Sequence, residues 1–517
     1  MDGLMMDMQL TLPMIARRAE TFFHRKEVVS RLPDRSYHRY SYADMARRSR
    51  QLAAALQKLG VNPGDRVGTI CWNHHQHLEA YFGIPWMGAV LHTINPRLNP
   101  PDIVYIVNHA QDRVLLVDEA LLPLAQALRP QTQIEHLICV SERMEAPEDT
   151  LSYEALLAES SPEDFVEPEL DERQAAAMCY TSGTTGRPKG VLYSHRSMML
   201  HTIGAGMGAP MAFMETDVVC PVVPMFHVNA WGMPYTAAMV GANLVFPGPY
   251  LDPVSLAELF EHEHVTVTAG VPTLWLGLLQ LLDRQPGAYD LSSIRAIISG
   301  GQALPAAAMQ AFHDRFNIDI EQAWGMTETS PIGTANGVPS WAKDASREEQ
   351  LRYLNTGGRP TPLVEIRARG DEGFVPWDGA SMGELEIRGP WIASAYYENP
   401  EGASRFSDDG WLKTGDIVTI DPDGFVQITD RAKDIIKSGG EWISSVDLEN
   451  AAVGCPGVAE AAAIGIAHPR WDERPLLIVV RKVGSDVTAE AVRAHLAGEV
   501  AKWWLPDEIV FVDSLPH

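Results

Sequence analysis

The residues best suited to chemistry in this chain form one short stretch, residues 180–190, which reads YTSGTTGRPKG. Glycine lets the backbone turn tightly and expose its N–H groups, and successive exposed N–H groups make a concave anion site. The Ser and Thr hydroxyls add donors, and Lys189 adds a point charge that suits phosphate. We therefore expect a polyphosphate ligand. A flexible surface turn would not need a lysine and hydroxyls together, and Gly190 after the lysine does not fit a Walker P-loop.

The elements that must position this stretch are strands and helices in alternation. Apolar runs predict strands at residues 175–180, 217–224, 243–246, 265–269, 294–299 and 318–322. Strands that alternate with helices predict parallel sheets covered on both faces. Loops rich in Gly, His or Thr follow several of these strands, at residues 226–231, 300–304 and 324–329. Ligands of open α/β sheets bind beyond the carboxyl ends of strands, so we expect these loops to line one site.

The stretch at 180–190 resembles the phosphate loop of the adenylate-forming enzymes, which include acyl-CoA synthetases, adenylation domains of peptide synthetases and luciferases. Further motifs extend the resemblance from about residue 40 to the end of the printed sequence. It implies that the polyphosphate is ATP. The phosphate-loop residues that it assigns to ATP are Thr181, Ser182, Gly183, Thr184, Thr185 and Lys189.

The segment 324–328, WGMTE, is similar to the adenine motif of the same family. The resemblance implies that Trp324 stacks on the base beside Gly325, that Thr327 binds a phosphate oxygen, and that Glu328 reaches Mg²⁺. A Trp stands where the family more often has Tyr. Magnesium takes few protein oxygens and keeps several waters, so Glu328 with the hydroxyl of Thr184 would suffice.

The resemblance assigns the remaining site residues motif by motif. His227 would lie near the carboxylate and α-phosphate, so that His227 and Glu328 are the expected catalytic residues. Trp231 would gate the acyl pocket. The acyl and adenine side would further include Gly300, Gly301, Gln302 and Pro331; ribose, phosphate and adenine would contact Asp416, Arg431 and Trp442; and CoA would contact Lys437, Ser438, Gly439 and Gly440.

The resemblance also implies the domain plan. An N-terminal adenylation domain of α/β subdomains is expected at residues 1–430, with parallel sheets and a small antiparallel barrel-like region. A small α+β domain at residues 431–517 would move on a hinge near 430–433. The family's last motif, Pro-Arg-Thr-x-x-Gly-Lys, supplies a lysine to the first step. The printed sequence ends in DSLPH, so the small domain is expected to be cut before that motif, and no residue here takes the lysine's role.

Composition narrows the class of protein. The chain has 517 residues, 46% of them hydrophobic and 21% charged, which is typical of a globular protein of more than one domain. Its net charge of -26 argues against nucleic-acid or anionic-membrane partners. Cys71, Cys179 and Cys220 lie in apolar runs and are expected in the core, and the absence of a signal or membrane-spanning pattern favours a cytoplasmic protein. Residues 73–77, NHHQH, match no common zinc spacing and are predicted to be a solvated loop and helix start.

The reaction implied is an ATP-dependent ligation in two steps. A carboxylate would attack the α-phosphate and expel pyrophosphate, and the CoA thiol would then attack the acyl-adenylate. The segments FHVNAW and KSGGEWISS resemble fatty-acyl-CoA synthetases, including bacterial medium-chain and 3-methylmercaptopropionate-CoA ligases. We expect a homodimer that takes a small carboxylic acid. Two alternatives stay open: an adenylation-only ligase that loads a carrier protein, and a non-catalytic ATP-binding protein.

Overall fold

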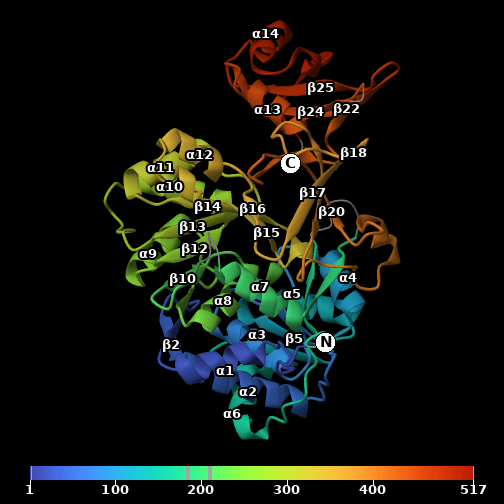
Figure 1. The fold of residues 1–517 in the computed structure, drawn as a ribbon. Helices are drawn as coiled ribbons and strands as arrows, with labels where there is room; N and C mark the ends of the chain where they lie inside the picture. Colours follow the sequence, from blue (N-terminus) through green and yellow to red (C-terminus); the bar gives the residue numbers. More distant parts are fainter. Residues whose placement is uncertain (2, 182–186, 208–211, 440, 516–517) are drawn as a thin grey trace. The chain divides into compact units, whose positions relative to one another are not determined.

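A computed structural model describes residues 1, 3–181, 187–207, 212–439 and 441–515 (Figure 1). The chain divides into two compact units. The large unit comprises Met1–Glu365 and Arg388–Leu412, and the small unit comprises Ile366–Ile387 and Lys413–His517. In the described residues, no helix has both the length and the apolar character needed to cross a membrane.

The larger sheet of the large unit is mostly parallel and carries most of the predicted site strands. Its order is β16 (Arg359–Pro360), β15 (Ile332–Ala335), β14 (Ile320–Gly325), β13 (Ala296–Gly300), β12 (Val267–Gly270), β10 (Val218–Pro221), β11 (Asn243–Phe246), β1 (Glu27–Arg31) and β2 (Tyr37–Ser41). Pairing is parallel from β14 through β1, and β2, β15 and β16 add antiparallel edges.

The second sheet of the large unit leads into the phosphate-loop stretch. Its order is β7 (Leu151–Ser152), β6 (His136–Val140), β5 (Asp112–Asp118), β3 (Arg66–Ile70), β4 (Val90–Thr93), β8 (Ala175–Tyr180) and β9 (Gly190–Ser194). The first six strands pair in parallel, whereas β8 and β9 pair antiparallel and flank the stretch. Parallel strands are buried on both faces, which explains the apolar run at β8.

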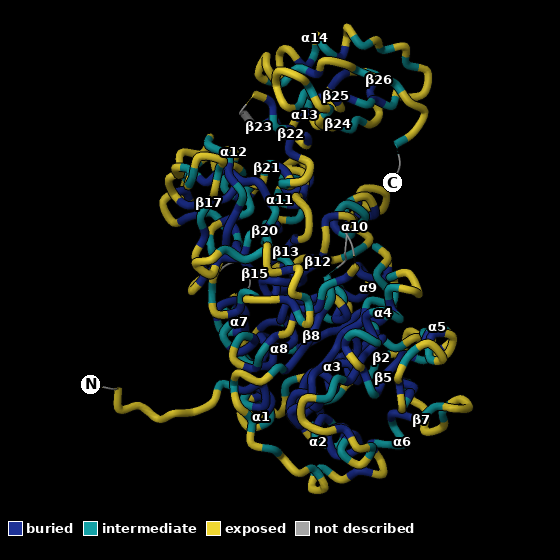
Figure 2. The backbone as a smooth tube through the Cα atoms, turned by 90° about the vertical axis from the view of Figure 1, so that its right-hand side faces the viewer, coloured by how far each residue is buried: buried dark blue, intermediate teal, exposed yellow. Residues whose placement is uncertain are grey.

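Helices of the large unit account for the alternation seen in the sequence. They are α1 (Pro13–Phe22), α2 (Tyr42–Lys58), α3 (His75–Trp86), α4 (Pro100–Ala110), α5 (Leu122–Leu128), α6 (Tyr153–Ala158), α7 (His195–Met207), α8 (Met233–Val240), α9 (Pro253–His262), α10 (Pro272–Arg284), α11 (Ala306–Phe316) and α12 (Arg347–Leu354). Local signals set several ends: Ser41 and Asp44 form a capping box that starts α2. Every residue of α3 is buried, as the tube colouring shows (Figure 2).

The small unit holds two further sheets. One contains antiparallel pairs, as expected for the small antiparallel region, in the order β18 (Gly373–Phe374), β17 (Glu365–Gly370), β19 (Gly383–Arg388), β20 (Leu412–Ile420) and β21 (Val426–Arg431). The other has the order β23 (Glu441–Ile443), β22 (Ile436–Ser438), β25 (Asp472–Arg481) and β24 (Val458–His468), with β26 (Glu508–Val512) beside β25.

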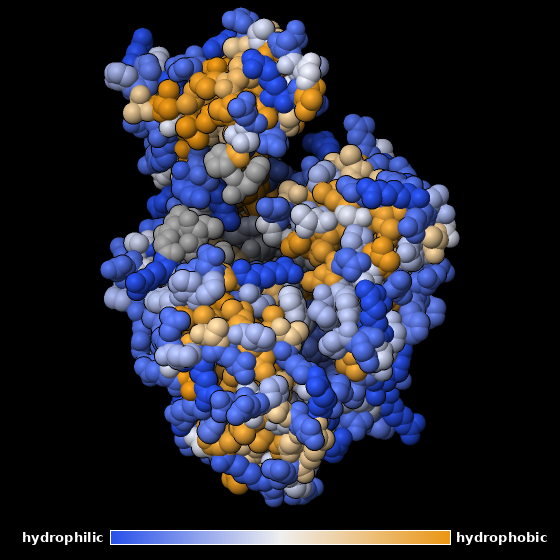
Figure 3. All heavy atoms as spheres, turned by 180° about the vertical axis from the view of Figure 1, so that it is seen from behind, coloured by the Kyte–Doolittle hydropathy of each residue, from blue (hydrophilic) through white to orange (hydrophobic). Residues whose placement is uncertain are grey.

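Helices α13 (Ser445–Val453) and α14 (Ala489–Glu499) complete the core of the small unit. Leu448 and Leu496 from these helices pack with Leu477 and Val479 of β25. Apolar side chains also gather on the visible face of this C-terminal part (Figure 3). The exposed apolar residues of its sheet include Ile464, Val510 and Val512.

The fold class predicted from the sequence is confirmed, and so is the burial of Cys71, Cys179 and Cys220. The prediction for residues 73–77 was wrong in part. A helix does start there, but His74, His75 and His77 are buried instead of solvated. The run of polar residues was predicted to lie at the surface, but tertiary contacts supply hydrogen bonds that the sequence does not reveal.

Candidate active site

The carboxyl ends of three neighbouring strands form one edge of the larger sheet. Strands β12, β13 and β14 run parallel, with Gly270 opposite Ser299 and Gly300 opposite Ala323. The loops that follow them, with the loop after β10, carry the candidate adenine and acyl residues. This is the edge at which an open α/β sheet presents ligands.

Trp231 and Gly300 lie against each other at this edge. A Cβ added to Gly300 would stand 2.8 Å from the Trp231 ring, so only glycine lets the indole approach the strand end. The backbone of residues 228–232 is left-handed throughout, with φ between 43° and 72°. This conformation costs roughly 1–2 kcal/mol for each non-glycine residue, and such strain is concentrated at functional sites. The turn fixes Trp231 in a buried position beside Gly300.

His227 begins this turn. Its side chain reaches solvent, yet the surrounding protein desolvates the imidazole and lowers its pKa. At neutral pH the ring is therefore neutral, and it can donate one hydrogen bond and accept another. That state suits a group placed between a carboxylate and a phosphate.

The two ends of the phosphate-loop stretch are joined by hydrogen bonds. The Thr181 amide donates to the Lys189 carbonyl at 3.0 Å, and the Lys189 amide donates to the Thr181 hydroxyl at 3.1 Å. Residues Ser182, Gly183, Thr184 and Thr185, predicted to bind ATP, lie outside the described residues.

Glu328 and Lys189 share one neighbour, Tyr396. The Tyr396 hydroxyl donates to Oε1 of the buried Glu328 carboxylate. The Lys189 ammonium lies 4.9 Å from the centre of the Tyr396 ring, within the range of a cation–π contact. Burial, and then the negative charge of Glu328, raises the pKa of the Tyr396 phenol, which keeps its proton. One tyrosine thus links the predicted phosphate-binding lysine to the predicted magnesium ligand.

Backbone contacts hold the segment that bears Thr327 and Glu328. The Tyr193 hydroxyl, on β9 beside the phosphate-loop stretch, donates to the Thr327 carbonyl at 2.7 Å. A Cβ on Gly325 would stand 1.8 Å from the Pro331 carbonyl oxygen, so this position admits only glycine. Trp324 is the penultimate residue of β14 and pairs with Thr334 across the strand ladder. Gly301 and Gln302 are exposed on the loop after β13.

The small unit contains the predicted ribose pair. Asp416 on β20 and Arg431 on β21 are register partners, and Arg431 Nη1 lies 2.7 Å from Asp416 Oδ1. The Asp416 side chain is only 4% exposed, whereas that of Arg431 is 58% exposed. The sequence predicted both residues but not this ion pair, because the pairing register brings them together across the hairpin.

The predicted CoA segment centres on Asp371. Lys437 Nζ lies 3.4 Å from Asp371 Oδ1, and the Trp442 indole N–H donates to Oδ2 at 3.1 Å. The Lys437 ammonium also lies 4.9 Å from the Trp442 ring. Gly439 has a left-handed φ of 64°, and its amide donates to the Trp471 carbonyl. Ser438 accepts from Arg474, and Gly440 lies outside the described residues.

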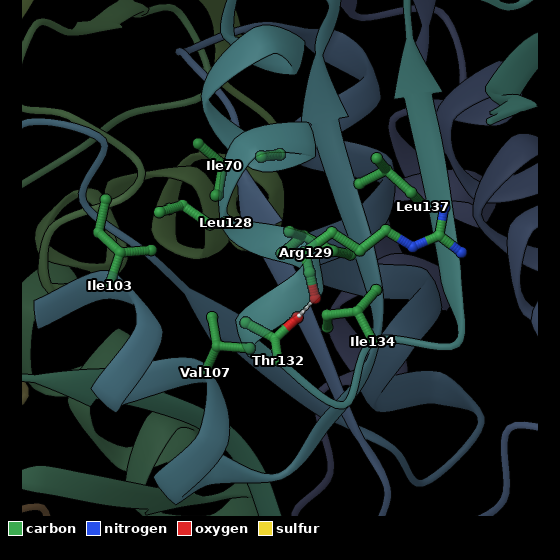
Figure 4. Close-up of a pocket in the computed structure, with 10 residues that line it drawn as sticks. Ile70, Ile103, Val107, Leu128, Arg129, Thr132, Ile134 and Leu137 are labelled. Atoms are coloured by element: carbon green, nitrogen blue, oxygen red, sulfur yellow. Dashed lines mark hydrogen bonds between the residues drawn. The ribbon is translucent and has the colours of Figure 1, made fainter. Parts of the chain in front are cut away.

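A small apolar cavity lies elsewhere in the large unit, between α4, α5 and the second sheet (Figure 4). Its residues include Ile70, Ile103, Val107 and Leu137, and the Thr132 hydroxyl donates to the Arg129 carbonyl. Its volume of about 10 Å³ is at the lower limit for one water molecule. This cavity is a packing gap and cannot hold an acyl group.

The large unit therefore brings Lys189, Thr327, Glu328 and the Trp231–Gly300 contact into one set of loops. Sequence reasoning missed Tyr396 and Tyr193, although they tie this set together. Nothing in residue type or spacing separates Tyr396 from its neighbour Tyr397, and only the contact with Glu328 identifies it.

Comparisons with known proteins identify the family to which the chain is similar. The family model of AMP-binding enzymes matches residues 15–397, and the model of their C-terminal domain matches residues 447–517. The chain is 50% identical to a long-chain-fatty-acid–CoA ligase of Thermus thermophilus, over 99% of this chain and 94% of that protein. It is 44% identical to a 3-methylmercaptopropionyl-CoA ligase of Ruegeria lacuscaerulensis, over 99% and 96%. An anthranilate CoA ligase solved with anthranoyl-AMP superposes with a TM-score of 0.82 at 26% identity, over 99% of this chain and 95% of that one.

Proposed function

Because this chain belongs to the AMP-binding enzyme family, we propose that it is an AMP-forming acyl-CoA ligase, which joins a carboxylic acid to coenzyme A using ATP. The observation that carries the proposal is the linkage of Lys189, Tyr396 and Glu328 beside the strand-end loops. A cation and a carboxylate held by one tyrosine provide what a polyphosphate and its metal need. The two similar ligases support the reaction class by their names.

In the first step the carboxylate oxygen of the acid attacks the α-phosphorus, and pyrophosphate leaves with the electrons of the broken P–O bond. Lys189 would neutralise charge on the phosphates, and His227 would orient the attacking carboxylate. Trp231 would form the wall of the acyl pocket. Such transfers depend mainly on positioning and on preorganised charge.

Glu328 fits a magnesium ion. It is a buried carboxylate whose Oε1 accepts a hydrogen bond from Tyr396. Oε2 is the oxygen that a hard cation would take, and the Thr184 hydroxyl is the predicted second ligand. When bound, magnesium would neutralise phosphate charge. Tyr396 would keep the carboxylate in the orientation needed for this contact.

In the second step the CoA thiol attacks the acyl carbon, and AMP leaves with the electrons of the broken acyl–oxygen bond. We assign Asp416 and Arg431 to the ribose and phosphate of the nucleotide, and the segment of Lys437, Ser438 and Gly439 to CoA. Movement of a small domain on a hinge near 430–433, with a domain boundary after residue 430, would let one site serve both steps. We also propose that the protein is a homodimer located in the cytoplasm.

The acid belongs to the fatty or short- to medium-chain carboxylic acids. Similar ligases named for a long-chain fatty acid and for 3-methylmercaptopropionate both match over nearly the whole chain, so the acid has to be measured. A panel of C3–C16 acids with 3-methylmercaptopropionate would be assayed for pyrophosphate release without CoA, and for thioester formation with CoA.

We expect both activities with at least one acid. Pyrophosphate release without any CoA thioester would support the carrier-loading alternative. Binding of ATP with neither activity on any acid would contradict the ligase assignment.

A further inference from the structure

Three potential metal ligands meet where the two sheets of the large unit approach each other. His38 lies on β2, His75 begins α3, and Glu142 follows β6 of the second sheet. Their ligand atoms lie within 4.8 Å of one another. None of the three belongs to the nucleotide or acyl site.

The distances from the two histidines to the carboxylate are close to those between ligands of a tetrahedral ion. His75 Nε2 lies 3.5 Å from Glu142 Oε1, and His38 Nδ1 lies 3.6 Å from Glu142 Oε2. The ligands of a tetrahedral zinc ion stand about 2.0–2.1 Å from the metal and hence roughly 3.3 Å from one another. The two imidazoles stack at 3.8 Å with 3° between their planes, so the partly exposed His38 ring has to turn about its side-chain bonds before both rings can direct a nitrogen at one ion.

His75 is a buried side chain that lacks hydrogen-bond partners. Its side chain is fully buried, and in the described residues neither Nδ1 nor Nε2 has a hydrogen-bond partner. Buried polar atoms in proteins normally have partners, so this position calls for one.

Glu142 is held in place by a second group. The Gln76 side-chain amide donates to Glu142 Oε1 at 3.0 Å and to Glu154 Oε1 at 3.1 Å. Carboxylate ligands in metal sites are commonly oriented by such hydrogen bonds. The Glu142 side chain is 40% exposed, so an ion can reach it from solvent.

A neighbouring cluster has similar residues but satisfied atoms. Among Cys71, His74 and Asp118, His74 Nε2 lies 2.7 Å from Asp118 Oδ1, and Asp118 Oδ2 accepts from the Trp72 amide. His74 Nδ1 accepts from the His77 amide. The nitrogens of His74 and the carboxylate of Asp118 are thus already engaged in hydrogen bonds within the protein.

We propose that His38, His75 and Glu142 bind a divalent transition-metal ion of the zinc type, with a water completing the coordination. Two imidazoles and a carboxylate favour Zn²⁺ or Co²⁺ over Mg²⁺ or Ca²⁺, which prefer oxygen ligands. The ion would cross-link an edge strand of one sheet to the end of a strand in the other. Its effect would be on the stability of the large unit.

The test uses the full chain after treatment with a chelator and without ATP. Calorimetric titration with ZnCl₂ is expected to show one tight equivalent, and CoCl₂ to give the visible absorption of a tetrahedral site. Zinc is also expected to raise the melting temperature, because it binds the folded state. His75→Ala and Glu142→Gln should each weaken zinc binding at least tenfold.

Matched variants separate this site from others. His24→Ala removes an exposed histidine elsewhere and should leave the titration unchanged. Cys71→Ser should also leave it unchanged, and loss of the tight equivalent in that variant would place the ion in the neighbouring cluster and overturn the proposal. Should His75→Ala fail to fold, His38→Gln on the edge strand provides the same comparison. Tight binding that survives both His38→Gln and Glu142→Gln, or no tight equivalent in the unmodified chain, would also overturn it.

Discussion

Replacing Tyr396 with Phe removes the one hydroxyl that links the Lys189 contact to Glu328 in the proposed nucleotide site. The ring stays, so the contact with the Lys189 ammonium is kept, while the hydrogen bond to Glu328 Oε1 is lost. The change therefore isolates the orientation of the Glu328 carboxylate from the placement of the lysine.

The expected size follows from the type of hydrogen bond. A hydrogen bond to a charged group contributes roughly 1.5–3 kcal/mol, and each 1.4 kcal/mol corresponds to about a tenfold change in rate. If the bond serves to hold Glu328 for magnesium and phosphate, adenylation should slow by roughly 10- to 100-fold. The Glu328 side chain is buried, so unfolding should also become easier, by about 1–3 kcal/mol.

The assay is pyrophosphate release in the absence of CoA, followed over a range of magnesium concentrations. Tyr397→Phe is the matched control, because it makes the same chemical change at the next residue, whose ring contacts His109. We expect Tyr396→Phe to need more magnesium for half-maximal rate and Tyr397→Phe to behave as the unmodified protein. An unchanged rate and magnesium dependence in Tyr396→Phe, with normal folding, would refute the positioning role.

Further predictions concern the pocket, the hinge and the response to acid. Trp231→Ala should open the space beside Gly300 and shift preference toward longer or bulkier acids in the acid panel; an unchanged ranking would remove Trp231 from the pocket wall. Lys433→Pro fixes φ at the expected hinge, so thioester formation should fall more than adenylation, and equal loss of both would place the pivot elsewhere. Burial lowers the pKa of His201 to about 3, so between about pH 6.5 and that value the unfolded chain binds a proton that the folded chain does not. The free energy of unfolding should then fall by about 1.4 kcal/mol per pH unit as the pH drops. Urea unfolding at pH 7 and pH 5 should show a smaller fall for His201→Gln than for the unmodified protein. Equal falls in the two proteins would contradict the role of this histidine.

Local chemistry explains why much of the fold could be read from the chain. The run at β8 is apolar over its full length because a parallel strand is covered on both faces, and it was located correctly. Glycine is required at residue 300 because the Trp231 ring approaches closely, and at residue 325 because the Pro331 carbonyl oxygen does. Both glycines lie in sequence motifs that could be recognised from the chain. The assignment of Lys189 to phosphate rests on its sequence neighbours alone and stays a prediction.

The tertiary structure decided what depends on residues distant in the chain. Tyr396 forms a hydrogen bond to Glu328, 68 residues away in the chain, whereas the contact of the neighbouring Tyr397 ring is with His109. His75 reads as a surface histidine until helix α3 is seen to be buried on all sides, and its approach to His38 and Glu142 joins three segments. The sequence by itself determined the local elements and the motif residues, because propensity, glycine geometry and apolar patterning act over a few positions. It could not determine which buried polar atoms find partners, since hydrogen bonds and burial are settled only when distant segments pack.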